Sequence, residues 1–434
     1  MQTTDAILNV RQGKKDSLIQ DVLKRLGYLV ITFLLVFLPF QTPLGSLIKS
    51  PELLLWVDEM FVAFVFILFL ATFFFEGKIR KGPLQILICL ILLGVIGMAS
   101  GLMNGNSFIV TANGIFDYIK NFLVIPALFA FSISEKRVGK IFIVLHRMAI
   151  ALCLIAILQE IAFFLGAPVK KLGVSYYEVR FGLMRASSLM GHPNIFGLYA
   201  LLFFTLDLSL TRRMRWQNLL FASGIFLSIS RMVWIGFFIS FFFLFIQAKG
   251  RKFKILFLLA TILIAFSIPT FYSITAREID KSVYFRGYAL SKSLEIFKDH
   301  PVWGVGPGMY GGVVSFTFDS PVYQKYSFDK DWLDFIKGFR SLDQFWPQIF
   351  AEMGGVGTLF FGFLLFYLWK VPKKISEISG NEFRKKMLSG ISVIPIVLVI
   401  YLFGSGLNLT PFLLTYSTLL GLMLGMEDEN PPGQ

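Results

Sequence analysis

Apolar runs of roughly 20 residues recur along the whole chain, and this feature constrains the fold more than any other. Wound as a helix, a run of that length crosses the hydrocarbon core of a bilayer, which is about 30 Å thick. Composition agrees, since 16% of the residues are charged, against about a quarter in typical soluble domains. The sequence therefore predicts an all-α, polytopic integral membrane protein that forms a single membrane domain over residues 1–434.

Twelve membrane-spanning helices are predicted from these runs. Their expected ranges are 28–48, 60–75, 84–100, 110–132, 141–165, 193–210, 217–230, 232–248, 255–273, 345–369, 388–408 and 410–426. An even number of spans places both termini on one side of the membrane. Six short segments on that side hold 24 of the 41 Lys and Arg residues, which identifies it as the cytoplasmic side.

This distribution of basic residues also explains the net charge of +14. The basic residues alternate with apolar runs and form no single patch, so nucleic acid is not an expected partner. Residues 1–27 are predicted to be a cytoplasmic segment, in which 16–26 has the periodicity of a helix lying on the membrane surface. Cys89 and Cys153 lie inside apolar runs, and their spacing predicts no disulfide.

Two extended segments, 166–192 and 274–344, are predicted to be loops on the opposite, periplasmic side. The second is far longer than an ordinary connection, and loops of that length are usually functional. Within it, SVYFRGYALSKSLEIFKDHP is predicted to be helical and to end at Pro301, and WGVGPGMYGG to be an irregular glycine-rich turn. GPGMYG (306–311) matches a dinucleotide motif, but no strand precedes it and Pro307 interrupts it, so a tight turn is the preferred interpretation.

Arg231 is the single charge in the 33 residues from Trp216 to Ala248. This length suits two shortened helices that meet at SISR, with Arg231 at their outer end or in a cavity open to that side. A charge facing lipid there costs several kcal/mol, the exact figure being contested. A functional arginine is one interpretation, and an arginine whose side chain reaches the outer headgroups is the other.

Further arginines occur on the predicted periplasmic side, where the orientation rule does not require them. They are Arg180, Arg185, Arg277, Arg286 and Arg340. The planar guanidinium group binds phosphate in two places at once, so several arginines near the outer leaflet suggest a diphosphate ligand. The alternative is a set of solvated loop charges. Their partners would be Glu278, Asp280, Glu295 and Asp299.

Metal ligands and cofactor motifs are not expected. His146, His192 and His300 lie in different segments, and no HExxH, DxD or Walker pattern occurs. Among the carboxylates, Asp343 near the start of a predicted span is a candidate general base or, equally, a helix N-cap. Glu160 near the outer end of a span is a second acid of interest, and Glu352 is interpreted as a structural contact within the membrane.

Four motifs resemble the superfamily of O-antigen polymerases and O-antigen ligases. In chain order they are RFGLMRASSLMGHPNIFGLY (180–199), SISRMVW (228–234), FRGYALSKSLEIFKDHPVWGVGPGMYG (285–311) and RSLDQFWPQIFAEMGGVGTLFF (340–361). The resemblance covers most of the chain. It implies an enzyme at the periplasmic face of the bacterial inner membrane that acts on glycans linked through diphosphate to undecaprenyl lipid.

The resemblance also implies roles for individual residues. Arg231 and Arg286 correspond to the two arginines that are thought to hold the diphosphate in the family. Arg180 and Gly191, followed by His192, resemble the R-x10-G stretch of polymerase loops. Further candidate substrate contacts are Arg185, Arg277, Tyr288 and Arg340.

One departure from the family pattern favours the polymerase branch. Ligases usually carry His-Asn nine and eight residues before the glutamate of the last motif, where this chain has Asp343 and Gln344. The expected reaction transfers a glycan from undecaprenyl diphosphate to a hydroxyl of a lipid-linked repeat unit. It is expected to need no metal, because the arginines would stabilise the leaving diphosphate, and to invert the anomeric configuration by direct displacement. The alternatives are a ligase that transfers glycan to lipid A-core or protein, and a polysaccharide-lipid flippase. A chain-length co-polymerase is a further possible partner.

Overall fold

The computed structural model describes the greater part of the chain. The described residues are 25–41, 44–45, 56–76, 84–129, 133–167, 178–180, 182–245, 279–339, 342, 344–407 and 409–426. The predicted surface helix 16–26 lies almost wholly outside these ranges, and the predicted span 255–273 lies outside them entirely. Helices dominate the described residues, in agreement with the predicted all-α class.

Ten helices form the bundle in the described part of the chain, in addition to the segment Arg25–Phe40. They are α4 (Val57–Glu76), α5 (Leu84–Met103), α6 (Phe108–Phe129), α7 (Glu135–Phe164), α8 (Pro193–Thr211), α9 (Trp216–Leu227), α10 (Arg231–Phe245), α16 (Phe345–Ile378), α18 (Ile394–Tyr401) and α19 (Thr410–Gly425). A short helix, α17 (Glu382–Ile391), joins α16 to α18. A two-stranded antiparallel hairpin, β1 (Val179–Arg180) and β2 (Leu183–Met184), connects α7 to α8.

Five of these helices are long and apolar enough to cross a membrane: α5, α6, α7, α8 and α16. Their ranges match predicted spans 84–100, 110–132, 141–165, 193–210 and 345–369, with ends that extend further in α7 and α16. The chain is therefore a helical membrane protein. The total of twelve spans remains a prediction.

The predicted span 388–408 is not one continuous helix, because it contains the last four residues of α17 and, after a two-residue turn, all of α18. α17 ends at Ile391, Ser392 and Val393 form a turn, and α18 ends at Tyr401. Pro395 lies in the first turn of α18, where a missing backbone N–H breaks no helical hydrogen bond. Because the hydropathy of residues 388–408 is high throughout, it did not predict the interruption of the helix.

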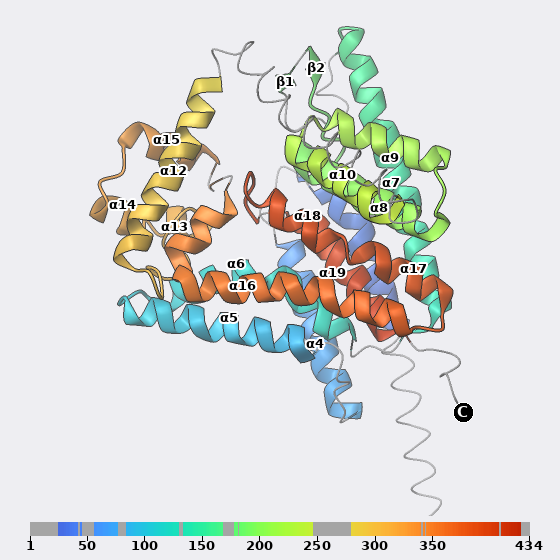
Figure 1. Ribbon diagram of the computed structural model, residues 1–434, viewed down its shortest axis with the longest axis horizontal. Coiled ribbons are helices and arrows are strands. Elements are labelled where there is room, and N and C mark those ends of the chain that lie inside the picture. Colours follow the sequence, from blue (N-terminus) through green and yellow to red (C-terminus); the bar gives the residue numbers. More distant parts are fainter. Residues whose placement is uncertain are drawn as a thin grey trace, which may run out of the picture.

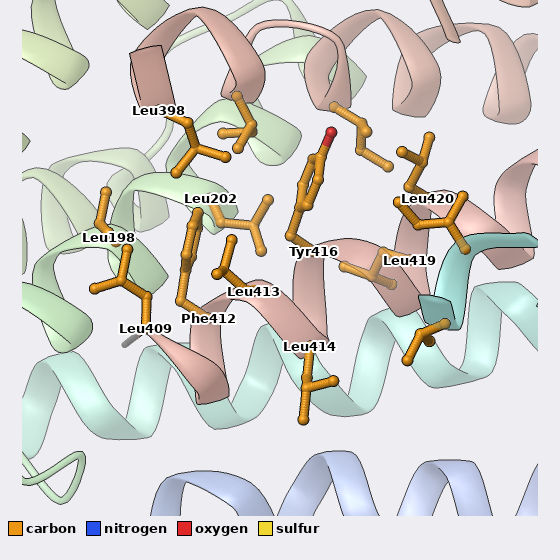
Figure 2. Packing of buried hydrophobic residues seen from close by; sticks show 14 of the residues in the cluster. Leu198, Leu202, Leu398, Leu409, Phe412, Leu413, Leu414, Tyr416, Leu419 and Leu420 are labelled. Carbon is orange, nitrogen blue, oxygen red and sulfur yellow. The ribbon is translucent and has the colours of Figure 1, made fainter. Parts of the chain in front are cut away.

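The core of the bundle is built around α19. Every residue of α19 except Pro411 is buried, because α6, α8 and α17 pack around it. Figure 2 shows Phe412, Leu413 and Tyr416 of α19 packed among leucines that include Leu202 and Leu398. A helix that is apolar on most of its surface is stable when it is covered in this way, because its side chains stay out of water.

The predicted loop 274–344 contains four helices in its described part. They are α12 (Ile279–Asp299), α13 (Val313–Thr317), α14 (Val322–Lys325) and α15 (Lys330–Phe339). α12 confirms the predicted helix that ends at Pro301. Figure 1 shows α12–α15 gathered on one side of the molecule, whereas α7, α9 and α17 lie on the other. α12, α14, α15 and the segments between them contribute to a second hydrophobic cluster, which includes Tyr310, Tyr323, Phe328 and Trp332 and also contains Ala351 of α16.

Candidate functional site

The junction between α9 and α10 places Arg231 at the start of a helix. α9 ends at Leu227, the turn 228–230 reverses the backbone, and Arg231 is the first residue of α10. Ile229 in this turn adopts a left-handed φ of 45°, which is uncommon for a β-branched residue. The prediction of two shortened helices meeting at SISR is confirmed. The N-terminus of a helix presents unpaired N–H groups, which favour an anion there.

Arg185 is held against this junction from the hairpin side. Only 5% of Arg185 is exposed, and its guanidinium donates to Glu178 Oε2 (2.7 Å) and Asn194 Oδ1 (2.9 Å). Its Nε donates to the carbonyl oxygen of Ser228 at 3.4 Å. The next residue, Ala186, donates its N–H to the carbonyl of Leu227 at 2.9 Å. The end of β2 and the end of α9 are therefore joined, and Arg185 lies beside the turn that leads to Arg231.

Arg180 and His192 belong to the same region. Arg180 pairs with Glu178, the carboxylate that also binds Arg185, so one acid bridges two predicted site arginines. His192 is the N-cap of α8, and its Nδ1 accepts the backbone N–H of Asn194 at 3.2 Å. We define the arginine cluster as Glu178, Arg180, Arg185 and Asn194, which contact one another beside the turn that leads to Arg231. His192 supports this cluster through the backbone of Asn194.

Replacing Glu178 by alanine is expected to lower the free energy of unfolding by about 2–3 kcal/mol, because the buried Arg185 loses its carboxylate partner. Chemical unfolding in detergent measures the change. Glu295→Ala is the matched control, since the Glu295 side chain is 52% exposed in its pair with Lys292 and is expected to contribute less than about 1 kcal/mol. Equal losses in the two variants would contradict the importance of the buried pair.

Arg286 lies on the inward face of α12. Ala289, Ser293 and Ile296 are buried at the helical spacing of three and four residues, and Arg286 precedes Ala289 by three. Tyr288 has a different position: its hydroxyl accepts the backbone N–H of Asp329 at 2.8 Å, and its ring packs on Trp332 with centroids 5.6 Å apart. Tyr288 therefore connects α12 to the start of α15.

Three predicted site residues, Arg277, Arg340 and Asp343, lie outside the described residues. Their roles remain predictions. The N-cap position of α16, the role considered for Asp343, is occupied by Gln344.

Glu352 connects three parts of the molecule. It is completely buried in α16, and its Oε1 accepts the backbone N–H of Tyr310 at 2.7 Å. Its Oε2 accepts from the hydroxyl of Tyr118 in α6 at 2.6 Å and from Gln348 Nε2 at 3.4 Å. These contacts agree with the interpretation of Glu352 as a structural residue. Through Tyr310, they also attach the glycine-rich turn 301–312 to α16.

Three buried tyrosines of the predicted periplasmic segment, Tyr310, Tyr323 and Tyr326, have a raised pKa. Burial raises the pKa of Tyr310 and Tyr323 well above the usual value. For Tyr326, burial and a hydrogen bond to Asp299 raise the pKa to about 12. The Tyr310 hydroxyl donates to the carbonyl of Ala289 in α12 at 2.7 Å. The turn is therefore bonded both to α16 and to α12.

A further charged cluster was not singled out from the sequence. Lys120 in α6 lies 2.9 Å from Glu59, 3.8 Å from Asp58 and 3.5 Å from Asp117. Asp58 and Glu59 belong to the first turn of α4, so the pairs link α4 to α6. The i, i+3 spacing of Asp117 and Lys120 was the only local signal for this cluster.

No group of three or more potential metal ligands from His, Cys, Asp and Glu occurs within the described ranges. Cys89 and Cys153 are both free and buried, as predicted from their positions in apolar runs.

One family comparison bears on these residues. Residues 216–362 match the family model described as O-antigen ligase. The match begins at the first residue of α9 and ends within α16, so it includes Arg231, Arg286 and Glu352. No curated protein matches the chain.

Proposed function

We propose that this chain, a member of the superfamily of O-antigen polymerases and O-antigen ligases, is a polysaccharide polymerase of the bacterial inner membrane. Its donor would be a growing glycan on undecaprenyl diphosphate, and its acceptor a single repeat unit on a second lipid carrier. The reaction would take place at the periplasmic face, with both termini in the cytoplasm. A separate chain-length co-polymerase would be a partner.

The observation that carries this proposal is the arginine cluster. A helix N-terminus that begins with Arg231 lies beside Arg185, whose guanidinium is already oriented by Glu178 and Asn194. Charged donors that are held in place before the reaction stabilise a developing anion without reorganisation. A diphosphate leaving group develops such a charge. This arrangement supports an anion site at the junction of α9 and α10.

In the proposed reaction, a hydroxyl oxygen of the acceptor sugar attacks the anomeric carbon of the donor glycan. The bond between this carbon and the phosphate oxygen breaks, and the electron pair leaves with undecaprenyl diphosphate. Arg231 and Arg286, with Arg185, would stabilise the negative charge on the diphosphate. Asp343 would take the proton of the attacking hydroxyl. Direct displacement inverts the anomeric configuration, and the bilayer holds both substrates close together.

A ligase is the second candidate, because the matched family model carries the description O-antigen ligase. The substitution of Asp343 and Gln344 for the His-Asn of ligases favours the polymerase. The two activities differ in the acceptor, which is a lipid-linked repeat unit for a polymerase and lipid A-core or a protein for a ligase.

Purified protein incubated with undecaprenyl-diphosphate-linked repeat units is expected to produce a ladder of lipid-linked polymers. One undecaprenyl diphosphate is released for each new linkage, which a phosphate assay after enzymatic hydrolysis can count. The polymerase proposal is wrong if no ladder forms and glycan is transferred only when lipid A-core is added. A deletion strain provides an independent test, since loss of a polymerase leaves single repeat units attached to core.

A further inference from the structure

We propose that Glu352 and Tyr310 are positioning residues that hold Arg286 in place through a continuous chain of hydrogen bonds from α6 to α12. This inference rests on the function proposed for Arg286. It concerns residues that lie outside the arginine cluster and that touch no substrate in the proposed reaction. The argument begins at a break in α16.

α16 is interrupted at Gly354, where the backbone adopts φ 58° and ψ −161°. A break in a helix leaves backbone N–H and C=O groups without their usual partners, and buried groups of this kind require replacements. The turn after α12 supplies them. Val305 and Gly306 donate their N–H groups to the carbonyls of Ala351 (2.9 Å) and Glu352 (2.8 Å).

The same pairing continues on the other side of the break. Gly355 donates its N–H to the carbonyl of Pro301 at 2.8 Å, and Val356 donates to that of Val302 at 3.2 Å. Backbone hydrogen bonds on both sides of the break therefore join the turn to α16. The two segments approach so closely that a side chain at Gly354 would lie 2.6 Å from the backbone of Val302.

The end of α5 and the residues that follow it hold the turn from the opposite side. The hydroxyl of Ser100 donates to the carbonyl of Trp303 at 2.6 Å, and the Asn104 amide donates to that of Gly304 at 2.9 Å. Asn106 donates to the carbonyl of Val305 at 2.7 Å. The turn is thus clamped between α5 and α16, and Glu352 adds the connection to Tyr118 of α6.

Tyr310 extends this chain of hydrogen bonds to α12. Its N–H is bound by the Glu352 carboxylate at 2.7 Å, and its hydroxyl donates to the carbonyl of Ala289 at 2.7 Å. Ala289 lies one helical turn after Arg286 on the inward face of α12. The chain from Tyr118 through Glu352 and Tyr310 therefore ends within one turn of the arginine. A misplacement of about 1 Å at a reacting group can cost about 100-fold in rate, so this connection is expected to matter for catalysis.

Two variants interrupt the chain at different links. Glu352→Gln replaces one acceptor oxygen by an amide NH₂ that faces a donor, and Tyr310→Phe removes only the hydroxyl that binds Ala289. Tyr416→Phe is the matched control, because Tyr416 is fully buried and its hydroxyl has no hydrogen-bond partner among the described residues. Glu352→Gln is expected to lower kcat about 30-fold and Tyr310→Phe about 10-fold, while KM for the lipid-linked donor changes less than about threefold. Tyr416→Phe is expected to leave both constants unchanged.

A second readout does not depend on activity. Spin labels on Ser291→Cys in α12 and Leu165→Cys after α7, both exposed positions, report the distance between α12 and the bundle, with Cys89 and Cys153 replaced by alanine. The parent protein is expected to show one narrow distance distribution, and Tyr310→Phe and Glu352→Gln a broader one. If Glu352→Gln fails to fold, Tyr310→Phe still provides the test.

Outcomes for the two proposals are separate. Unchanged distance distributions and unchanged kcat in folded Tyr310→Phe and Glu352→Gln would overturn the positioning role, even if Arg286→Ala is inactive. Broadened distributions together with a fully active Arg286→Ala would leave α12 anchored as described but would remove the proposed function of Arg286.

Discussion

Alanine in place of Arg231 is expected to lower the rate of glycan transfer by about 100- to 1,000-fold, because the leaving diphosphate loses a charged donor held at a helix N-terminus. The measurement is the initial rate of polymer formation from purified lipid-linked repeat units. Arg231→Lys should recover part of the activity, since lysine restores the charge but not the planar pair of donors.

Arg213 provides the control for this experiment. It is exposed in the connection between α8 and α9, and Arg213→Ala is expected to retain the parent rate. Thermal unfolding of both variants verifies that the bundle is intact. Full activity in a folded Arg231→Ala variant would rule out the proposed role of Arg231 in binding the diphosphate.

Alanine in place of Gly354 is expected to lower the free energy of unfolding by about 3 kcal/mol or more. The backbone there adopts φ 58° and ψ −161°, a combination that only glycine adopts without strain. The new Cβ would also lie 2.6 Å from the carbonyl of Val302, where neither backbone segment can move without breaking the paired turn. Chemical unfolding in detergent measures the loss, and glycan transfer should fall with it.

Gly362 is the matched control in the same helix. Apart from neighbouring residues and the backbone of its own helix, no atom of the described residues lies within 4 Å of a Cβ built at Gly362, and the Gly362 backbone is helical. Gly362→Ala is therefore expected to be neutral or to stabilise the protein by up to about 1 kcal/mol through helix propensity. Similar stabilities for the two alanine variants would show that the break at Gly354 is not required.

Several features of the site could be predicted from local sequence. The break between α9 and α10 followed from a 33-residue run that was too long for one span and too short for two full ones, with Arg231 as its single charge. The helix that ends before Pro301 and the glycine-rich turn after it followed from proline and glycine alone. The break in α16 was not predicted, because the expected span 345–369 runs through Gly354 without interruption.

The partners of the site residues were less predictable. Glu278, Asp280, Glu295 and Asp299 were considered as possible partners for the loop arginines. Glu178 is the acid that pairs with both Arg180 and Arg185, from within the same hairpin. An antiparallel hairpin brings Glu178 beside Arg185, whose N–H bonds to the Glu178 carbonyl at 2.8 Å. No helical or charge pattern in the sequence predicts so short a hairpin.

By itself, the sequence determined that this chain is a helical membrane protein and where its best-defined spans lie. The reason is physical: a bilayer requires about 20 consecutive apolar residues with their backbone hydrogen bonds satisfied internally, and this requirement can be read residue by residue. Only the tertiary structure decided that Tyr118, Tyr310 and Glu352 meet, although 234 residues separate the first from the last. A buried carboxylate needs donors, and packing alone determines which distant segments provide them.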